Sequence, residues 1–105
     1  MGPGLLESVY HQCLVAELEM RGVGLRTMEP VALSYKGMPL DKNFIIDILV
    51  ENEVIVELKS VETILPVHEA QVISYLKLAN KRLGLLINFN AALLKHGFKR
   101  FVNGL

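Results

Sequence analysis

Hydrophobic residues recur along this chain at two spacings, one typical of helices and one typical of strands. Helical spacing predicts a first helix over residues 5–21, which Gly22 ends. The hydrophobic positions that carry this spacing are Leu6, Tyr10, Cys13, Leu14 and Leu18. A second helix is predicted over residues 66–80, because Pro66 is tolerated in a first helical turn.

Runs of β-branched and other apolar residues predict strands between and after the helices. The predicted strands are residues 31–35, 44–50 (FIIDILV), 54–60 (VIVELKS), 83–88 (LGLLIN) and a short edge strand at 97–102. Residues 36–39 (KGMP) and 51–53 (ENE) are predicted to be turns. The order helix, three strands, helix, strand predicts an α/β fold of αβββαβ type, with a mixed central sheet flanked by helices.

One carboxylate interrupts the most hydrophobic of these strands. Asp47 is the only charged residue within residues 44–50. An ionised carboxylate in a buried strand is costly unless it is paired, hydrogen-bonded or bound to a metal. Asp47 is therefore either a metal ligand or a structural residue that forms an ion pair or accepts a hydrogen bond from a backbone amide.

The next strand places an acid and a base on one face. Side chains alternate between the two faces of a strand, so Glu57 and Lys59 point the same way. If the turn is the three residues 51–53, antiparallel pairing places Asp47 opposite Glu57. A two-residue turn would instead place Asp47 opposite Leu58, on the wrong face. Two carboxylates this close repel each other, and Mg²⁺ or Mn²⁺, which prefer oxygen ligands, would relieve that repulsion.

The two helices offer further candidates for the same site. Glu7 lies at the edge of the apolar face of the first helix, where its carboxylate also favours the helix dipole. Glu17 falls within the same arc and is interpreted as structural. On the second helix, His68, Gln71 and Tyr75 share one face, and His68 and Gln71 lie near the helix start. The alternatives are a hydrogen bond at the helix start for His68 and core packing for Tyr75.

The composition limits both the size and the charge-driven functions of the protein. At 105 residues the chain is predicted to be one domain, residues 1–105. It carries 11 basic and 11 acidic residues, which argues against a broad electrostatic nucleic-acid-binding surface but allows a local basic rim around an acidic site. The sequence shows neither a signal-peptide pattern nor an apolar run long enough to span a bilayer, so we expect a cytoplasmic protein without membrane contact.

Hydrophobic residues make up 51% of the sequence, which is high for a small protein. Strands buried on both faces would account for this fraction, and an apolar patch for self-association is a compatible alternative. Met28, Met38 and Leu40 lie around the turn at 36–39 and predict a homodimer; the alternative is a monomer in which they form a small core under the turn. Cys13, the only cysteine, excludes an intramolecular disulfide, and its apolar surroundings predict a buried thiol.

Two sets of motifs resemble known families. Asp47 followed by residues 57–59 (ELK) on the next strand resembles the D…(D/E)-x-K pattern of the PD-(D/E)XK nuclease superfamily. Segments along nearly the whole chain resemble the GxxE protein family: residues 4–10 (GLLESVY), 56–59 (VELK), 66–71 (PVHEAQ), 75–77 (YLK), 85–89 (LLINF) and 95–101 (KHGFKRF). The resemblance implies a restriction-endonuclease-like αβββαβ core that carries a nuclease site.

The resemblance also implies roles for individual residues. Asp47 and Glu57 would be metal ligands, helped by the backbone carbonyl of Leu58. Lys59 would orient the attacking water or stabilise negative charge on the phosphorane. The metal would be Mg²⁺ or Mn²⁺, the ions that the carboxylate pair itself predicts.

Two further roles and two departures complete the comparison with these families. Glu7 would be an additional acidic residue near the metal, and Gln71 would assist from the second helix. Ile46 stands where the superfamily is named for a proline, a position that varies widely. Ile45 is apolar where related sequences often carry a basic residue, and the loss of that residue would weaken a phosphate contact.

These patterns together predict metal-assisted hydrolysis of a phosphodiester bond in nucleic acid. Two alternatives stay open. One is an interaction module that keeps the nuclease fold without activity, which the zero net charge favours. The other is the same metal chemistry on a substrate that is not nucleic acid.

Overall fold

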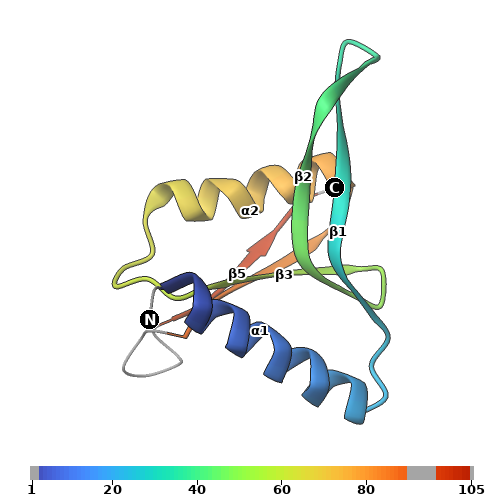
Figure 1. The fold of residues 1–105 in the computed structure, drawn as a ribbon. Helices are drawn as coiled ribbons and strands as arrows, with labels where there is room; N and C mark the ends of the chain where they lie inside the picture. The colour runs from blue at the N-terminus through green and yellow to red at the C-terminus, as the bar shows by residue number, and fades with distance from the viewer. Residues whose placement is uncertain (1–2, 90–96, 105) are drawn as a thin grey trace.

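The computed structural model describes residues 3–89 and 97–104, which form two helices and one five-stranded sheet (Figure 1). The elements are α1 (Pro3–Met20), β1 (Leu25–Tyr35), β2 (Met38–Val50), β3 (Val54–Lys59), α2 (Pro66–Ala79), β4 (Leu83–Asn88) and β5 (Phe98–Val102). The strands lie in the order β1-β2-β3-β4-β5, with β3 and β4 parallel and the other neighbours antiparallel. Between β3 and β4, α2 is the crossover that a parallel pair requires. The predicted α/β fold, a mixed sheet flanked by helices, is confirmed.

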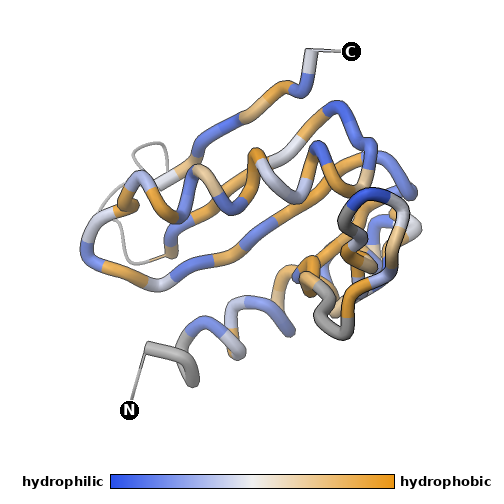
Figure 2. The backbone as a smooth tube through the Cα atoms, turned by 90° about the horizontal axis from the view of Figure 1, so that it is seen from above, coloured by the Kyte–Doolittle hydropathy of each residue, from blue (hydrophilic) through white to orange (hydrophobic). Residues whose placement is uncertain are grey.

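The central strands are covered on both faces by the helices. Figure 1 shows α2 above β3 and α1 below it. One core cluster joins buried residues of α2 to the sheet: Val72, Tyr75 and Leu76 with Ile46, Leu49, Ile55 and Leu86. The other joins Ile48, Val56 and Leu58 to Leu14 and Val15 of α1. Hydrophobic and hydrophilic residues alternate along much of the tube in Figure 2, whereas four consecutive residues of β3, three of them apolar, are buried.

The first two strands are longer than the sequence pattern predicts. β1 begins at Leu25 rather than at residue 31, and β2 begins at Met38 rather than at residue 44. The turn between them is only Lys36 and Gly37, with φ of 50° and 80°, the left-handed conformation that a two-residue hairpin turn needs. Since β2 has 13 residues and β3 only 6, the paired β1–β2 hairpin projects beyond β3 as an arm (Figure 1).

Smaller departures from the predictions concern element ends and one side chain. β3 ends at Lys59 instead of residue 60, and α2 ends at Ala79, where Asn80 caps it in a left-handed conformation with φ of 57°. The Cys13 thiol, predicted to be buried, is exposed, because α1 turns this position away from the sheet. Within the described residues, no helix is long and apolar enough to cross a membrane.

Close contacts hold α2 against β4 and fix the end of β3. A side chain at Gly84 would place its Cβ 2.8 Å from Val72, so the absence of a side chain lets α2 pack directly on β4. At the end of β3, the Phe89 N–H donates to the Lys59 carbonyl at 2.9 Å. These contacts fix the backbone from which the Lys59 side chain extends.

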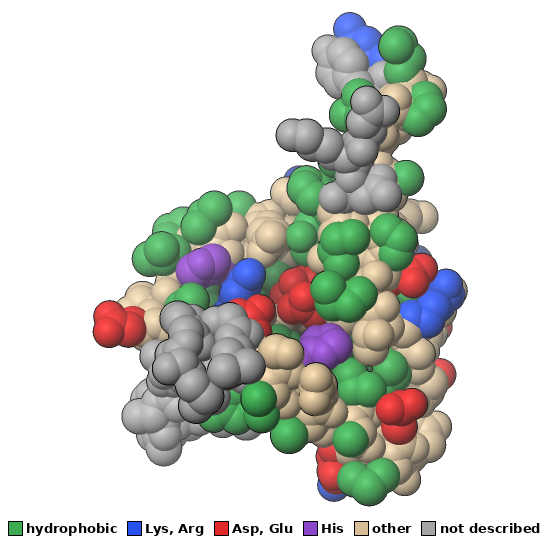
Figure 3. Space-filling model, in the orientation of Figure 1, with side chains coloured by type: hydrophobic (Ala, Val, Ile, Leu, Met, Phe, Trp, Pro, Cys, Tyr) green, Lys and Arg blue, Asp and Glu red, His purple; other side chains and the backbone are tan. Residues whose placement is uncertain are grey.

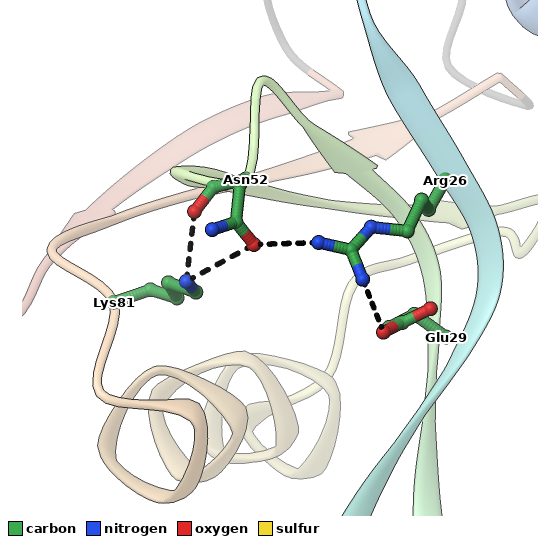
Figure 4. Close-up of polar contacts among 4 residues, drawn as sticks. All are labelled: Arg26, Glu29, Asn52 and Lys81. Carbon is green, nitrogen blue, oxygen red and sulfur yellow. Dashed lines mark hydrogen bonds and ion pairs between the residues drawn. The ribbon is translucent and has the colours of Figure 1, made fainter.

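The opposite end of β3 is tied by a polar network (Figure 4). The Arg26 guanidinium donates to Glu29 at 3.2 Å and to the Asn52 side chain at 3.1 Å. Lys81 Nζ donates to the Asn52 carbonyl at 2.7 Å. The network therefore links β1, the β2–β3 turn and the loop after α2.

Candidate metal and nuclease site

The β2–β3 hairpin has the register predicted from its three-residue turn. The ladder pairs Val50 with Val54 and Ile48 with Val56. One residue further along, side chains link the two strands: the Asp47 N–H donates to Glu57 Oε1 at 3.1 Å, and the Leu58 N–H donates to Asp47 Oδ2 at 2.9 Å. The two carboxylates are thereby held side by side at the end of the ladder.

The sequence left two structural roles open for Asp47: an ion pair, or a hydrogen bond accepted from a backbone amide. Asp47 does accept a backbone N–H, that of Leu58. It takes part in none of the ion pairs found among the described residues, which are Arg21–Glu17, Arg26–Glu29 and Lys99–Glu69. The Arg21–Glu17 pair agrees with a structural role for Glu17. The fixed Asp47 carboxylate is thus oriented by the backbone and not neutralised by an ion pair in this part of the chain.

Glu57 is the most unusual ionisable group of the site. Glu57 is only 3% exposed. Burial, followed by the negative charge of Asp47 and a carboxyl–carboxyl hydrogen bond with it, raises the pKa of Glu57 to about 9. The Lys59 charge and the hydrogen bond from the Asp47 N–H lower the pKa, but they do not offset the combined effect of burial and the Asp47 charge. At neutral pH Glu57 therefore holds a proton next to the Asp47 carboxylate.

α1 brings two more side chains to the carboxylate pair. Burial raises the pKa of Glu7; Lys59 lowers it and Asp47 raises it, which places the Glu7 carboxylate within electrostatic reach of both. His11 Nε2 lies 3.1 Å from the Asp47 carbonyl oxygen, and since a carbonyl only accepts, the ring N–H donates. The sequence did not single out His11, although its spacing of four residues from Glu7 places both on one helix face.

A pocket of about 270 Å³ opens on the α1 side of the carboxylate pair. Its lining includes Glu7, His11, Asp47 and Met28. Met28 lies in β1 between the residues that pair with Ile48 and Ile46, and its φ of 49° is rare for a non-glycine residue in a strand. Such strain is concentrated at functional sites, and here it places a long flexible side chain at the pocket edge.

The remaining candidates lie on the α2 side. Lys59, His68, Gln71 and Tyr75 line a second pocket of about 420 Å³. The Gln71 amide donates to the Tyr75 hydroxyl at 3.0 Å, and burial together with the Glu57 charge raises the pKa of Tyr75. His68 Nδ1 accepts the Leu65 N–H at 2.9 Å, so the hydrogen bond at the helix start considered for this histidine is present. Tyr75 is also a core residue, 4% exposed.

Figure 3 shows acidic side chains near the centre of one face of the molecule, with histidine and basic side chains close to them. The structure therefore brings Glu7, Asp47, Glu57 and Lys59 into one region, with Gln71 on its α2 side. Among the described residues, no group of three or more His, Cys, Asp and Glu side chains is arranged to hold a metal ion.

The carboxylate pair nevertheless fits a divalent cation. Mg²⁺ is commonly held by one or two carboxylates, with water and substrate phosphate supplying the other oxygen ligands. Asp47 and Glu57 supply two carboxylates that contact each other, and the raised pKa of Glu57 reflects burial beside a second carboxylate, which the Lys59 charge does not offset. The donor set is hard oxygen throughout, so Mg²⁺ or Mn²⁺ suits it better than a metal that prefers sulfur.

A mixed sheet flanked by two helices, with an Asp on β2 and a Glu-x-Lys on β3, defines a restriction-endonuclease-like protein. A family model described as the PD-(D/E)XK nuclease superfamily matches residues 1–101. The chain belongs to this superfamily. Neither a curated protein nor a solved structure matches the chain.

Proposed function

We propose that this protein is a GxxE-type, metal-dependent nuclease that hydrolyses phosphodiester bonds in nucleic acid in the cytoplasm. The observation that carries the proposal is the buried Asp47–Glu57 pair, whose proton and hydrogen bonds would be replaced by a divalent cation. Superfamily membership supports the nuclease fold and the use of a divalent metal. Net charge of zero requires that affinity for the substrate be local to the site.

Each residue of the site has a part in this proposal. Asp47, Glu57 and the Leu58 carbonyl would hold Mg²⁺ or Mn²⁺. When bound, the ion supplies charge that polarises the scissile phosphate and makes water a stronger nucleophile at neutral pH. Lys59 follows Glu57 on the same face of β3, and its ammonium would orient the attacking water and stabilise charge on the phosphate.

Three further residues surround the Asp47–Glu57 pair and would support it. Glu7 adds a third carboxylate from α1, close enough for the charges of Lys59 and Asp47 to change its pKa. Gln71, held by the Tyr75 hydroxyl, lines the same pocket as Lys59 and would position the water or a phosphate oxygen. The His11 ring N–H donates to the Asp47 carbonyl and would keep the Asp47 backbone in place.

Mn²⁺ should bind the wild-type protein and should not bind Asp47→Ala, because the substitution removes one of the two carboxylates. Calorimetric titration measures this difference, and cleavage assays on single- and double-stranded DNA and RNA then test activity. Asp47→Asn should also abolish metal binding while leaving the metal-free protein equally or more stable, since it removes repulsion at Glu57. A clear loss of metal-free stability in Asp47→Asn would favour a structural role, and metal binding without cleavage would favour the inactive module.

We also propose that the protein forms a homodimer through the β1–β2 arm. Met38 and Leu40 of the arm are 68% and 48% exposed, so they do not form a buried core under the turn. Met28, which is 58% exposed, does not lie near this turn as predicted but at the edge of the acidic pocket, level with Asp47. Exposed apolar side chains gathered on one projecting element are typical of interfaces, and a twofold dimer would double the contact surface for a substrate.

Light scattering at micromolar concentration should give about twice the chain mass of 11.7 kDa. Leu40→Glu should return the mass to that of one chain, because it places a charge in the proposed interface. Met20→Glu is the matched control, since Met20 is 75% exposed at the far end of α1. A single-chain mass for the wild-type protein would contradict the dimer.

A further inference from the structure

The pocket on the α2 side is separate from the acidic pocket and has a different chemical character. It encloses about 420 Å³, within the range of roughly 300–1,000 Å³ typical of small-molecule sites. None of the described residues that line it carries a carboxylate, whereas Glu7 and Asp47 line the pocket on the α1 side. Lys59 lines this pocket, and its charge also acts on Glu57 of the carboxylate pair. A group bound here would therefore lie beside the bond that the site cuts.

The walls of this pocket suit a flat apolar group. Phe44 of β2 contributes a half-buried ring, which is supported by the buried Tyr75 at a centroid distance of 5.0 Å and an angle of 51°. Ala70 and Ser74, which also line the pocket, are exposed small residues one turn apart on α2. An aromatic ring together with small side chains in the lining suits a planar ring.

The lining also includes the polar side chains of His68 and Gln71, which can serve as partners for the edge of such a ring. Since His68 Nδ1 accepts the Leu65 N–H, the neutral imidazole carries its proton on Nε2, which is a hydrogen-bond donor. Gln71 uses its amide nitrogen on Tyr75, and its amide oxygen is an acceptor. A planar apolar body with donors and acceptors on its edge describes a nucleobase.

We infer that this pocket binds one unpaired base of the strand that is cut, so that the substrate is single-stranded nucleic acid. The inference rests on the proposed nuclease function and adds the substrate class to it. A base within a duplex is paired and stacked, so it cannot enter a side pocket without first leaving the helix. With 11 basic and 11 acidic residues the chain has no net charge to attract a duplex, whereas base stacking supplies affinity without phosphate neutralisation.

Binding can be tested without metal or cleavage, by fluorescence anisotropy in EDTA with short labelled strands. The probes are a DNA strand, the RNA strand of the same sequence, the matching DNA duplex, and an abasic DNA strand that keeps every phosphate. The wild-type protein should bind at least one of the two single strands about tenfold or more tightly than the duplex and the abasic strand, since a stacked base is worth about 1–3 kcal/mol. The DNA and RNA arms identify which backbone is preferred. Equal binding of the normal and abasic strands would overturn the inference.

The pocket is tested by filling it from the exposed side of α2. Ala70→Phe should weaken single-strand binding about tenfold or more. Ile73→Phe is the matched control, because Ile73 is 40% exposed on the same helix and lies outside the pocket lining. Phe44→Leu keeps an apolar side chain in the core but removes the ring, and it should weaken binding as well. Unchanged binding in both folded pocket variants would refute the assignment.

The two proposals fail in different ways. Absence of Mn²⁺ binding and of cleavage in the wild-type protein would contradict the nuclease proposal while leaving base-dependent binding in EDTA intact. Loss of base dependence with Mn²⁺ binding and cleavage preserved would contradict only the pocket assignment, and it would point to recognition of the phosphate backbone.

Discussion

Replacing Lys59 with methionine should slow metal-dependent cleavage by about 10²–10³-fold and leave Mn²⁺ affinity nearly unchanged. Methionine keeps most of the apolar stem of the lysine, so packing at the end of β3 is retained while the ammonium is lost. The backbone there is held independently of the side chain, by the Phe89 N–H bond to the Lys59 carbonyl. Single-turnover cleavage and Mn²⁺ calorimetry on the same preparation separate the two effects.

Lys81→Met is the matched control for this experiment. Lys81 donates to Asn52 at the opposite end of β3, so its loss should leave cleavage unchanged (Figure 4). If Lys59→Met instead weakened Mn²⁺ binding as strongly as it slowed cleavage, Lys59 would be acting on the carboxylates and not on the phosphate. Cleavage that survives Lys59→Met at the wild-type rate would remove Lys59 from the proposed mechanism.

The part of the site that lies on the β2–β3 hairpin could be predicted from the sequence. Strand alternation places Glu57 and Lys59 on one face, and the odd length of the turn fixes which residue of β2 meets Glu57. These are local rules that depend on neighbouring residues only. The structure bears out the register, with Val50 opposite Val54, and brings Asp47 into contact with Glu57.

The parts that could not be predicted depend on contacts between distant segments. Residues 25–30 and 38–43 contain Pro30, Pro39 and several charged or polar residues, so they resemble a loop and a turn. They become strand because each pairs with a distant part of the hairpin: residues 25–30 pair with residues 45–50, and residues 38–43 pair with residues 32–35. Proline is tolerated in such strands where they form the edge of a sheet. His11 shares a helix face with Glu7, but this spacing alone does not mark it as a site residue, and its approach to the Asp47 carbonyl is what reveals it.

The carboxylate pair also fixes how stability should respond to pH. The pKa of Glu57 is about 9 in the folded protein and 4.5 as its ordinary value. Between these values the folded state binds more protons than the unfolded state, so stability falls as pH rises. Below about pH 4.5 both states are protonated and the penalty is absent, whereas above about pH 9 it is complete. The contribution of Glu57 should therefore make the metal-free protein most stable in mild acid.

Glu57→Gln should stabilise the metal-free protein at pH 8 by several kcal/mol, because each unit of pKa shift corresponds to about 1.4 kcal/mol. Glutamine has the shape of the protonated acid, and its amide oxygen can still accept the Asp47 N–H. Urea unfolding in EDTA between pH 5 and pH 9 measures the effect: wild-type stability should fall across this range, and the difference between the two proteins should shrink towards pH 5. Saturating Mn²⁺ should raise the stability of the wild type and not of the variant. Glu62→Gln, at an exposed position beyond β3, should follow the wild-type profile. A variant that is less stable than the wild type at pH 8 would show that Glu57 is ionised and paired in the folded protein.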